Sequence, residues 1–131
     1  MPRGINMIKW FNVKAKNGVA SLYSNSITLN TTAMYPFEIA HKVQVGMSDE
    51  GNIVIQPLTK AFIETGNLDE SCLLKIERHK SFARISSVTL MKQIGEALNI
   101  ALSNSPVQYE TTWDSEENIL TILIKNGPKK S

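Results

Sequence analysis

Two stretches of the sequence combine basic and aromatic side chains in a way that could bind nucleic acid. The first, KWFNVKAK (residues 9–16), contains three lysines, and the second, KIERHKSFAR (75–84), contains four basic residues and a histidine. If both stretches lie on one face of the folded chain, they form a positive patch that can neutralise several phosphates. The residues expected to contact DNA are Lys14, Lys16, Arg78, Lys80 and Arg84.

The composition of these stretches favours contact with the phosphate backbone over recognition of bases. Arginine is the usual reader of guanine edges, and only Arg78 and Arg84 occur outside the N-terminus. The aromatic rings of Trp10, Phe11 and Phe82 are expected to pack in the core rather than to stack on bases. Sequence-specific recognition is therefore less supported than binding through phosphates.

Residue types that carry catalysis or bind metals are few and scattered. His41 and His79 lie in different segments with no carboxylate at an informative spacing, and Cys72 is the single cysteine. Buried packing is the usual role of a lone cysteine. The seven glycines are isolated, so no phosphate-binding loop is present. We therefore expect no enzyme activity, no metal, no cofactor and no small-molecule substrate.

Length and composition are those of one globular domain. The 131 residues are 42% hydrophobic and 20% charged, enough to bury a core without disulfides. A single cysteine fits a reducing compartment. No apolar run approaches the roughly 18 residues of a membrane span, and the first ten residues contain no hydrophobic signal core. We therefore expect a cytoplasmic protein that is not bound to a membrane.

The formal net charge is only +2, but the charges alternate along the chain. Residues 1–37 carry +4 and residues 38–74 carry −4, whereas residues 75–92 carry +4 and residues 93–124 carry −5. The pattern therefore contains two basic–acidic cycles. Solvated surface charge can produce such blocks by chance, but a duplicated unit would produce them in register.

Hydrophobic alternation and turn signals predict a chain made mainly of strands. Strands are expected at 7–15, 19–23, 26–30, 42–47, 52–58, 73–79, 82–87, 107–113 and 118–124. The clearest helix spans 87–102, where Leu90, Ile94, Leu98 and Ala101 recur at helical spacing. A short helix is expected within 31–41, with Pro36 in its first turn. Residues 59–71 form a polar connection.

The predicted elements occur twice in the same order. Each half would be a β-β-α-β-β unit, the first over about 7–58 and the second over about 72–125. At the hairpin turns, Asp49, Asn52 and Ile53 match Asp114, Asn118 and Ile119. Because half-units of this size cannot bury both faces of a sheet alone, the two should share one core. We expect a single α+β domain over 1–131, mostly β and pseudo-symmetric.

The segment 27–57 resembles the AbrB/MazE/SpoVT superfamily of small swapped-hairpin DNA-binding domains. The matching positions are Ile27, Thr28, Leu29, Val43, Val45, Asp49, Gly51, Asn52, Ile53, Ile55 and Pro57. A looser similarity follows in the second half, at Ile85, Ile94, Leu98, Ile100, Asn118 and Ile119. The resemblance implies an AbrB-like barrel, a homodimer and DNA binding in transcriptional regulation. The chain departs from the family at Asn30, where a proline is common, and in its first helix, which has no basic residue.

A second function is compatible with the same pattern. Strand edges and alternating charge blocks also suit association between proteins, with the basic face of one copy against the acidic face of another. The alternative is therefore a protein-interaction or structural module that does not bind nucleic acid.

Overall fold

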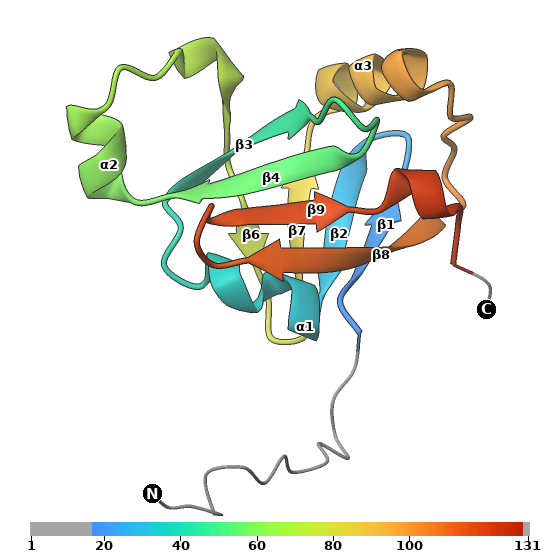
Figure 1. The fold of residues 1–131 in the computed structure, drawn as a ribbon, viewed down its shortest axis with the longest axis horizontal. Coiled ribbons are helices and arrows are strands. Elements are labelled where there is room, and N and C mark those ends of the chain that lie inside the picture. Colours follow the sequence, from blue (N-terminus) through green and yellow to red (C-terminus); the bar gives the residue numbers. More distant parts are fainter. Residues whose placement is uncertain (1–16, 130–131) are drawn as a thin grey trace, which may run out of the picture.

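The computed structural model describes residues 17–129, and these form a curled antiparallel sheet with short helices at its ends (Figure 1). The predicted strand over 7–15 lies outside the described residues. Mainly β structure with three α-helices in the described part confirms the expected α+β class, mostly β. None of the described helices is long and apolar enough to cross a membrane.

The sheet has nine strands in the order β5-β3-β4-β9-β8-β1-β2-β7-β6, all paired antiparallel. Their bounds are β1 Val19–Leu22, β2 Ser26–Asn30, β3 Lys42–Met47, β4 Ile53–Leu58, β5 Leu73–Leu74, β6 Glu77–Arg78, β7 Phe82–Ser86, β8 Val107–Asp114 and β9 Ile119–Ile122. The predicted strand at 73–79 is therefore split into two short strands. Every other predicted strand within the described residues is confirmed, with ends shifted by up to two residues.

The sheet curls back on itself because the two strands at the ends of its order are neighbours in sequence. Only Lys75 and Ile76 separate β5 from β6. Within this stretch, β5 pairs with β3 and β6 pairs with β7. In Figure 1, β3, β4 and β9 cross the direction of β1, β2 and β7. The concave side of the curled sheet encloses the core.

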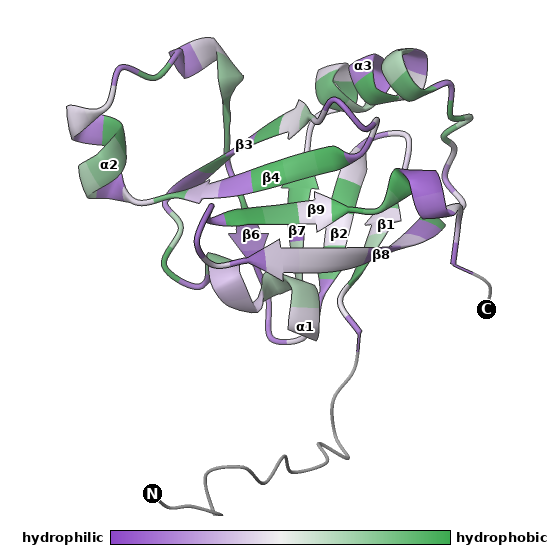
Figure 2. Cartoon of the chain, viewed as in Figure 1, coloured by the Kyte–Doolittle hydropathy of each residue, from purple (hydrophilic) through white to green (hydrophobic). Residues whose placement is uncertain are grey.

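The core is built from alternate residues of nearly every long strand. The fully buried side chains with the largest volumes are Phe37, Leu22, Ile27, Leu29, Ile53, Ile55, Leu58, Ile85, Met91, Leu120, Ile122 and Val43. Burying each such side chain contributes about 1.5–3 kcal/mol to folding. β9 is hydrophobic along most of its length, whereas β6 is hydrophilic (Figure 2). The alternation that predicted these strands therefore also predicts which residues face inward.

Two helical segments cover opposite ends of the curled sheet (Figure 1). At one end, α1 (Thr31–Met34) continues into the 3-10 helix η2 (Tyr35–Phe37). The Asn30 side chain accepts a hydrogen bond from the Ala33 N–H and caps α1, and Pro36 stands in the first turn of η2. This confirms the short helix predicted within 31–41. Phe37 then enters the core, where its ring lies edge-on to Trp113, with 6.2 Å between the ring centroids.

At the other end, α3 (Val88–Leu98) begins after Ser87, whose side chain caps the Leu90 N–H. Asn99 adopts a left-handed conformation (φ 55°) and ends the helix, because its own N–H and that of Ile100 both bond to the Gly95 carbonyl. The prediction that the helix reaches residue 102 was wrong, and Ala101 lies beyond it. Met91 and Ile94 are the buried residues of α3.

The polar connection predicted over 59–71 holds a third helix, α2 (Lys60–Thr65), and the 3-10 helix η3 (Glu70–Cys72). Neither element contains a buried residue. In Figure 1, α2 projects from the end of β4, away from α1. Since this connection packs little against the core, it links β4 to β5 without shaping the rest of the fold.

Candidate functional site

The second basic stretch forms the hairpin of β6 and β7, and this places its cations on two different faces. The turn is closed by the His79 N–H, which donates to the Phe82 carbonyl at 2.8 Å. Glu77 pairs with Arg84, and Arg78 pairs with the buried Ala83. Because successive side chains of a strand point to opposite faces, Arg78 and Arg84 lie on opposite faces of the hairpin. The structure therefore separates two of the residues predicted to act together.

The exposed Arg78 side chain hydrogen-bonds to the chain segment that follows α1. Its Nη1 donates to the Ala40 carbonyl at 2.7 Å and to the Phe37 carbonyl at 3.3 Å. The Phe37 carbonyl also accepts the Ala40 N–H at 3.1 Å, so Arg78 adds a charged donor to a turn that is already hydrogen-bonded. Arg78 thus joins the hairpin to the η2 segment, a role that the sequence pattern did not reveal.

Arg84 lies on the outer face of the sheet in contact with an aromatic ring. Its guanidinium carbon is 5.2 Å from the centroid of the Phe82 ring. The same ring stacks on the His79 imidazole at a centroid distance of 4.4 Å. Phe82 is therefore half-buried beneath two basic side chains, rather than packed in the core as expected. Cation–π contacts of this kind hold an arginine in place while its N–H groups stay available.

A row of polar side chains crosses the outer face at the level of Arg84. The strand registers place Gln108, Ser21, Thr28, Arg84 and Glu77 side by side across β8, β1, β2, β7 and β6. Gln108 Nε2 donates to Ser21 Oγ at 3.2 Å. Thr28 Oγ1 is buried and has no hydrogen-bond partner within the described residues. The Thr28 hydroxyl is therefore an unmet hydrogen-bonding group beside a guanidinium.

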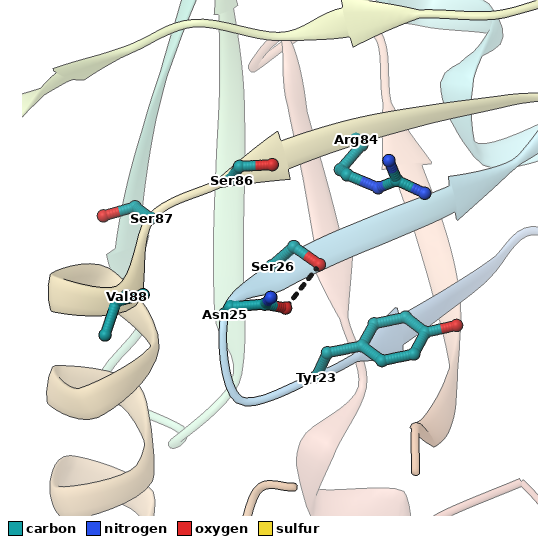
Figure 3. A pocket seen from close by; sticks show the side chains of 7 residues that line it. All are labelled: Tyr23, Asn25, Ser26, Arg84, Ser86, Ser87 and Val88. Atoms are coloured by element: carbon teal, nitrogen blue, oxygen red, sulfur yellow. Dashed lines mark hydrogen bonds between the residues drawn. The ribbon is translucent and has the colours of Figure 1, made fainter. Parts of the chain in front are cut away.

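The outer face is hollowed on either side of the Thr28–Arg84 pair. A hollow of about 600 Å³ lies toward α3 and includes Arg84 in its lining (Figure 3). A second hollow of about 350 Å³ lies toward the hairpin turn and is lined by Thr28, Ser81, Phe82 and Lys129, among others. Lys129 was not among the predicted site residues. Lys129 is held there because its N–H donates to the carbonyl of Gln108, in the strand β8 that neighbours β1.

The start of the described chain lies beside the same hairpin. Asn30 Nδ2 donates to the Asn17 carbonyl at 3.1 Å, and Asn30 pairs with Phe82 across β2 and β7. Thr31 Oγ1 donates to the Ser81 carbonyl at 2.9 Å, which joins α1 to the hairpin turn. Lys80 is exposed in that turn. Lys14 and Lys16 lie outside the described residues, and Lys16 directly precedes Asn17.

Side chains that could carry catalysis do not gather among residues 17–129. Cys72 is exposed, not buried as a core residue would be. His41 and His79 are also exposed. No group of three or more His, Cys, Asp or Glu residues that could hold a metal ion occurs in the described part of the chain.

Two groups between residues 17 and 129 have clearly shifted pKa values, and neither lies in the basic hairpin. Hydrogen bonds from the Ser71 hydroxyl and, to a lesser extent, the Ser71 N–H lower the pKa of the Asp69 carboxyl. Burial raises the pKa of the Tyr109 phenol. Asp69 is the cap of η3, and Tyr109 faces the core from β8. Both shifts therefore report on the fold and not on the candidate site.

Exposed apolar side chains cluster after α1. Tyr35 and Ile39 are 72% and 78% exposed, and Trp113 at the end of β8 is 37% exposed beside Phe37. This surface was not predicted from the sequence. The segment TTAMYPFEIA could have indicated it, because it contains more apolar residues than a four-residue helix can bury.

Comparison with known proteins gives no family. The chain matches no protein-family model, no curated protein and no solved structure.

Proposed function

We propose that this chain binds duplex DNA, mainly through phosphates, and acts in transcriptional regulation. The observation that carries the proposal is the gathering of cations around the β6–β7 turn. Lys80 stands in the turn, Arg84 is held over Phe82, and Lys129 lines a hollow with Ser81 and Phe82. Asn17, which directly follows Lys16, is hydrogen-bonded to Asn30, and Asn30 pairs with Phe82 at the start of β7. Cations arranged in this way can neutralise several phosphates of one duplex.

The five predicted contact residues take two roles in this proposal. Lys80 and Arg84, together with Lys14 and Lys16, supply charge to the phosphates. Arg78 is instead a positioning residue, because its Nη1 is bonded to the carbonyls of Ala40 and Phe37. Removing Arg78 would weaken DNA binding only through the hairpin that it holds.

We further propose that the fold is a duplicated AbrB-like barrel. Two strand pairings support this idea, because they join equivalent strands of the two halves. β2 pairs with β7 around Thr28 and Arg84, and β4 pairs with β9 around Val54 and Thr121. Likewise, β1 bridges β2 and β8, while the stretch 73–78 bridges β7 and β3. A two-fold axis relating the halves would produce these equivalences.

The backbone of the two hairpin turns supports the same relation with one correction to the predicted alignment. Gly51 (φ 84°) and Asn118 (φ 58°) have positive φ in the turns that precede the final strand of each half. Gly51 therefore corresponds to Asn118, and Ile53 corresponds to Leu120 rather than to Ile119. Both members of this last pair are buried, whereas Ile119 is only half-buried.

Charge reversal tests the DNA proposal. Lys80→Glu and Arg84→Glu should each weaken binding to a random-sequence duplex by about tenfold or more at low salt, because each removes one phosphate contact and adds repulsion. Lys60→Glu is the matched control, since Lys60 lies in α2 away from the hairpin (Figure 1). The measurement is fluorescence anisotropy of a labelled duplex. Equal weakening by all three variants, or no binding by the native chain, would contradict the proposal.

The exposed surface of Tyr35 and Ile39 favours protein association as a second candidate function. Large apolar side chains so exposed within five residues of one another are typical of contact surfaces. A homodimer, as the family resemblance implies, is the simplest partner. Tyr35→Ser with Ile39→Ser should then shift the sedimentation of the chain from dimer to monomer, and an unchanged monomer would contradict this candidate.

A further inference from the structure

The hollow between the ends of β2 and β7 and the start of α3 has the chemistry of an anion site. Its volume is about 600 Å³, within the range of pockets for small ligands. The seven residues that line it are Tyr23, Asn25, Ser26, Arg84, Ser86, Ser87 and Val88. The lining residues carry one guanidinium, four hydroxyls and one amide, and none of them is acidic; the Ser87 hydroxyl is already engaged as the cap of α3. We propose that this hollow binds an organic phosphate, with Arg84 holding the phosphoryl group.

The arrangement of the side chains suits a ligand with both a charged and a hydroxylated part. In Figure 3, the Ser26 side chain lies between those of Arg84 and Tyr23, and all three are on one side of the strands. Ser26 is only 6% exposed, and its hydroxyl donates to Asn25 Oδ1 at 3.3 Å. The Ser26 oxygen thus keeps its acceptor capacity, and Asn25 keeps its two amide donors. These groups can bond to the hydroxyls of a sugar carried by the phosphate.

Two features next to Arg84 favour an anion over a neutral ligand. Thr28 Oγ1, across the strand pair from Arg84, is buried without a partner in the described chain, and an unmet buried hydroxyl costs about 1–3 kcal/mol. The first turn of α3 adds the backbone N–H of Val88, a lining residue whose N–H has no partner within the helix.

The phosphoryl group could belong to a free nucleotide-sized ligand or to the backbone of a nucleic acid. The lining is the same for both, because Arg84 lies between this hollow and the β6–β7 turn. In the first case the hollow is a separate effector site, and DNA bound at the β6–β7 turn leaves its ligand in place. In the second case it is the place where a phosphate of the bound strand rests.

Titration with adenosine 5′-monophosphate, followed through backbone amide chemical shifts, tests the site. The native chain should show saturable shifts at Ser26 and at residues 86–89, with a dissociation constant below about 1 mM. Arg84→Gln should weaken binding by about tenfold or more, since it removes a charge-assisted contact. Lys80→Gln, a matched loss of charge at the turn, should change the affinity by less than about twofold. Adenosine, which lacks the phosphoryl group, should cause no saturable shift.

The variants remain informative if one of them is unstable, because amide dispersion reports folding in the same spectra and Arg84→Lys offers a charge-conserving alternative.

Addition of duplex DNA distinguishes the two sources of phosphate. Displacement of the nucleotide indicates a site shared with DNA, and retention indicates a separate effector site. Absence of saturable shifts in the native chain, or equal binding by Arg84→Gln, would overturn the proposal. Neither result would contradict DNA binding, which Lys80→Glu tests separately.

Discussion

Arg78 and Ala40 are 38 residues apart in sequence, yet Nη1 of Arg78 donates to the Ala40 carbonyl at 2.7 Å. A second bond from the same nitrogen reaches the Phe37 carbonyl at 3.3 Å. These contacts fasten the β6–β7 hairpin to the segment that carries Tyr35 and Ile39. Arg78 therefore helps to hold the basic hairpin against the exposed apolar surface, together with the bond from Thr31 Oγ1 to the Ser81 carbonyl.

Arg78→Gln should lower the free energy of unfolding by about 1.5–3 kcal/mol, the usual worth of a hydrogen bond from a charged group. Arg78→Lys should recover only part of this loss, because an ammonium cannot match the planar guanidinium. Urea denaturation measures the effect, with Lys80→Gln in the turn as a control of equal charge change. If Arg78→Gln is as stable as Lys80→Gln, Arg78 does not fasten the hairpin.

The buried phenol of Tyr109 predicts a loss of stability at alkaline pH. Burial raises the pKa of Tyr109 above its ordinary value of 10.0, so the unfolded chain releases this proton first. The contribution is fully present below pH 10 and is lost as the pH rises from 10 through the raised pKa. Tyr109→Phe should therefore lose less stability above pH 10 than the native chain. Tyr35→Phe, at a 72% exposed position, should behave like the native chain, and identical pH profiles for all three would refute the assignment.

Positive φ angles at Gly51 and Asn118 predict matching responses to substitution. Gly51→Asn should cost little, because asparagine tolerates the left-handed region, whereas Gly51→Val should cost about 1–2 kcal/mol. Asn118→Val should also cost at least this much, since it loses the bond from Asn118 Nδ2 to the Pro57 carbonyl as well. Thermal unfolding ranks the variants. Equal stability of Gly51→Asn and Gly51→Val would mean that the turn does not depend on its backbone conformation.

Local elements were predictable because their signals are local. Alternation along SITLN and FARIS predicted β2 and β7, and the helical spacing of apolar residues predicted α3. The helix was predicted too long because it ends where Asn99 adopts a left-handed conformation. Asparagine is also common in turns, so its presence in the sequence does not mark a helix end. The break at Lys75 and Ile76 follows from pairing with two different strands, which a single-sequence pattern does not contain.

The candidate site was predictable only in part, because its geometry depends on contacts between distant segments. The basic stretch 75–84 was predicted as one cluster, but the hairpin turn within it places Arg78 and Arg84 on opposite faces. Lys129 joins the site through a bond to Gln108, and Thr28 joins it through pairing with Arg84. Neither relationship leaves a pattern in the local sequence.

The salt dependence of DNA binding tests the central claim most directly. If the cations around the β6–β7 turn and the preceding lysines neutralise about four phosphates or more, the logarithm of the affinity for a random duplex should fall against the logarithm of salt concentration with a slope of about −4 or steeper. Arg84→Gln and Lys80→Gln should each reduce the steepness by about one, while Lys60→Gln should leave it unchanged. A slope near zero, or the same slope in all three variants, would contradict binding through this hairpin.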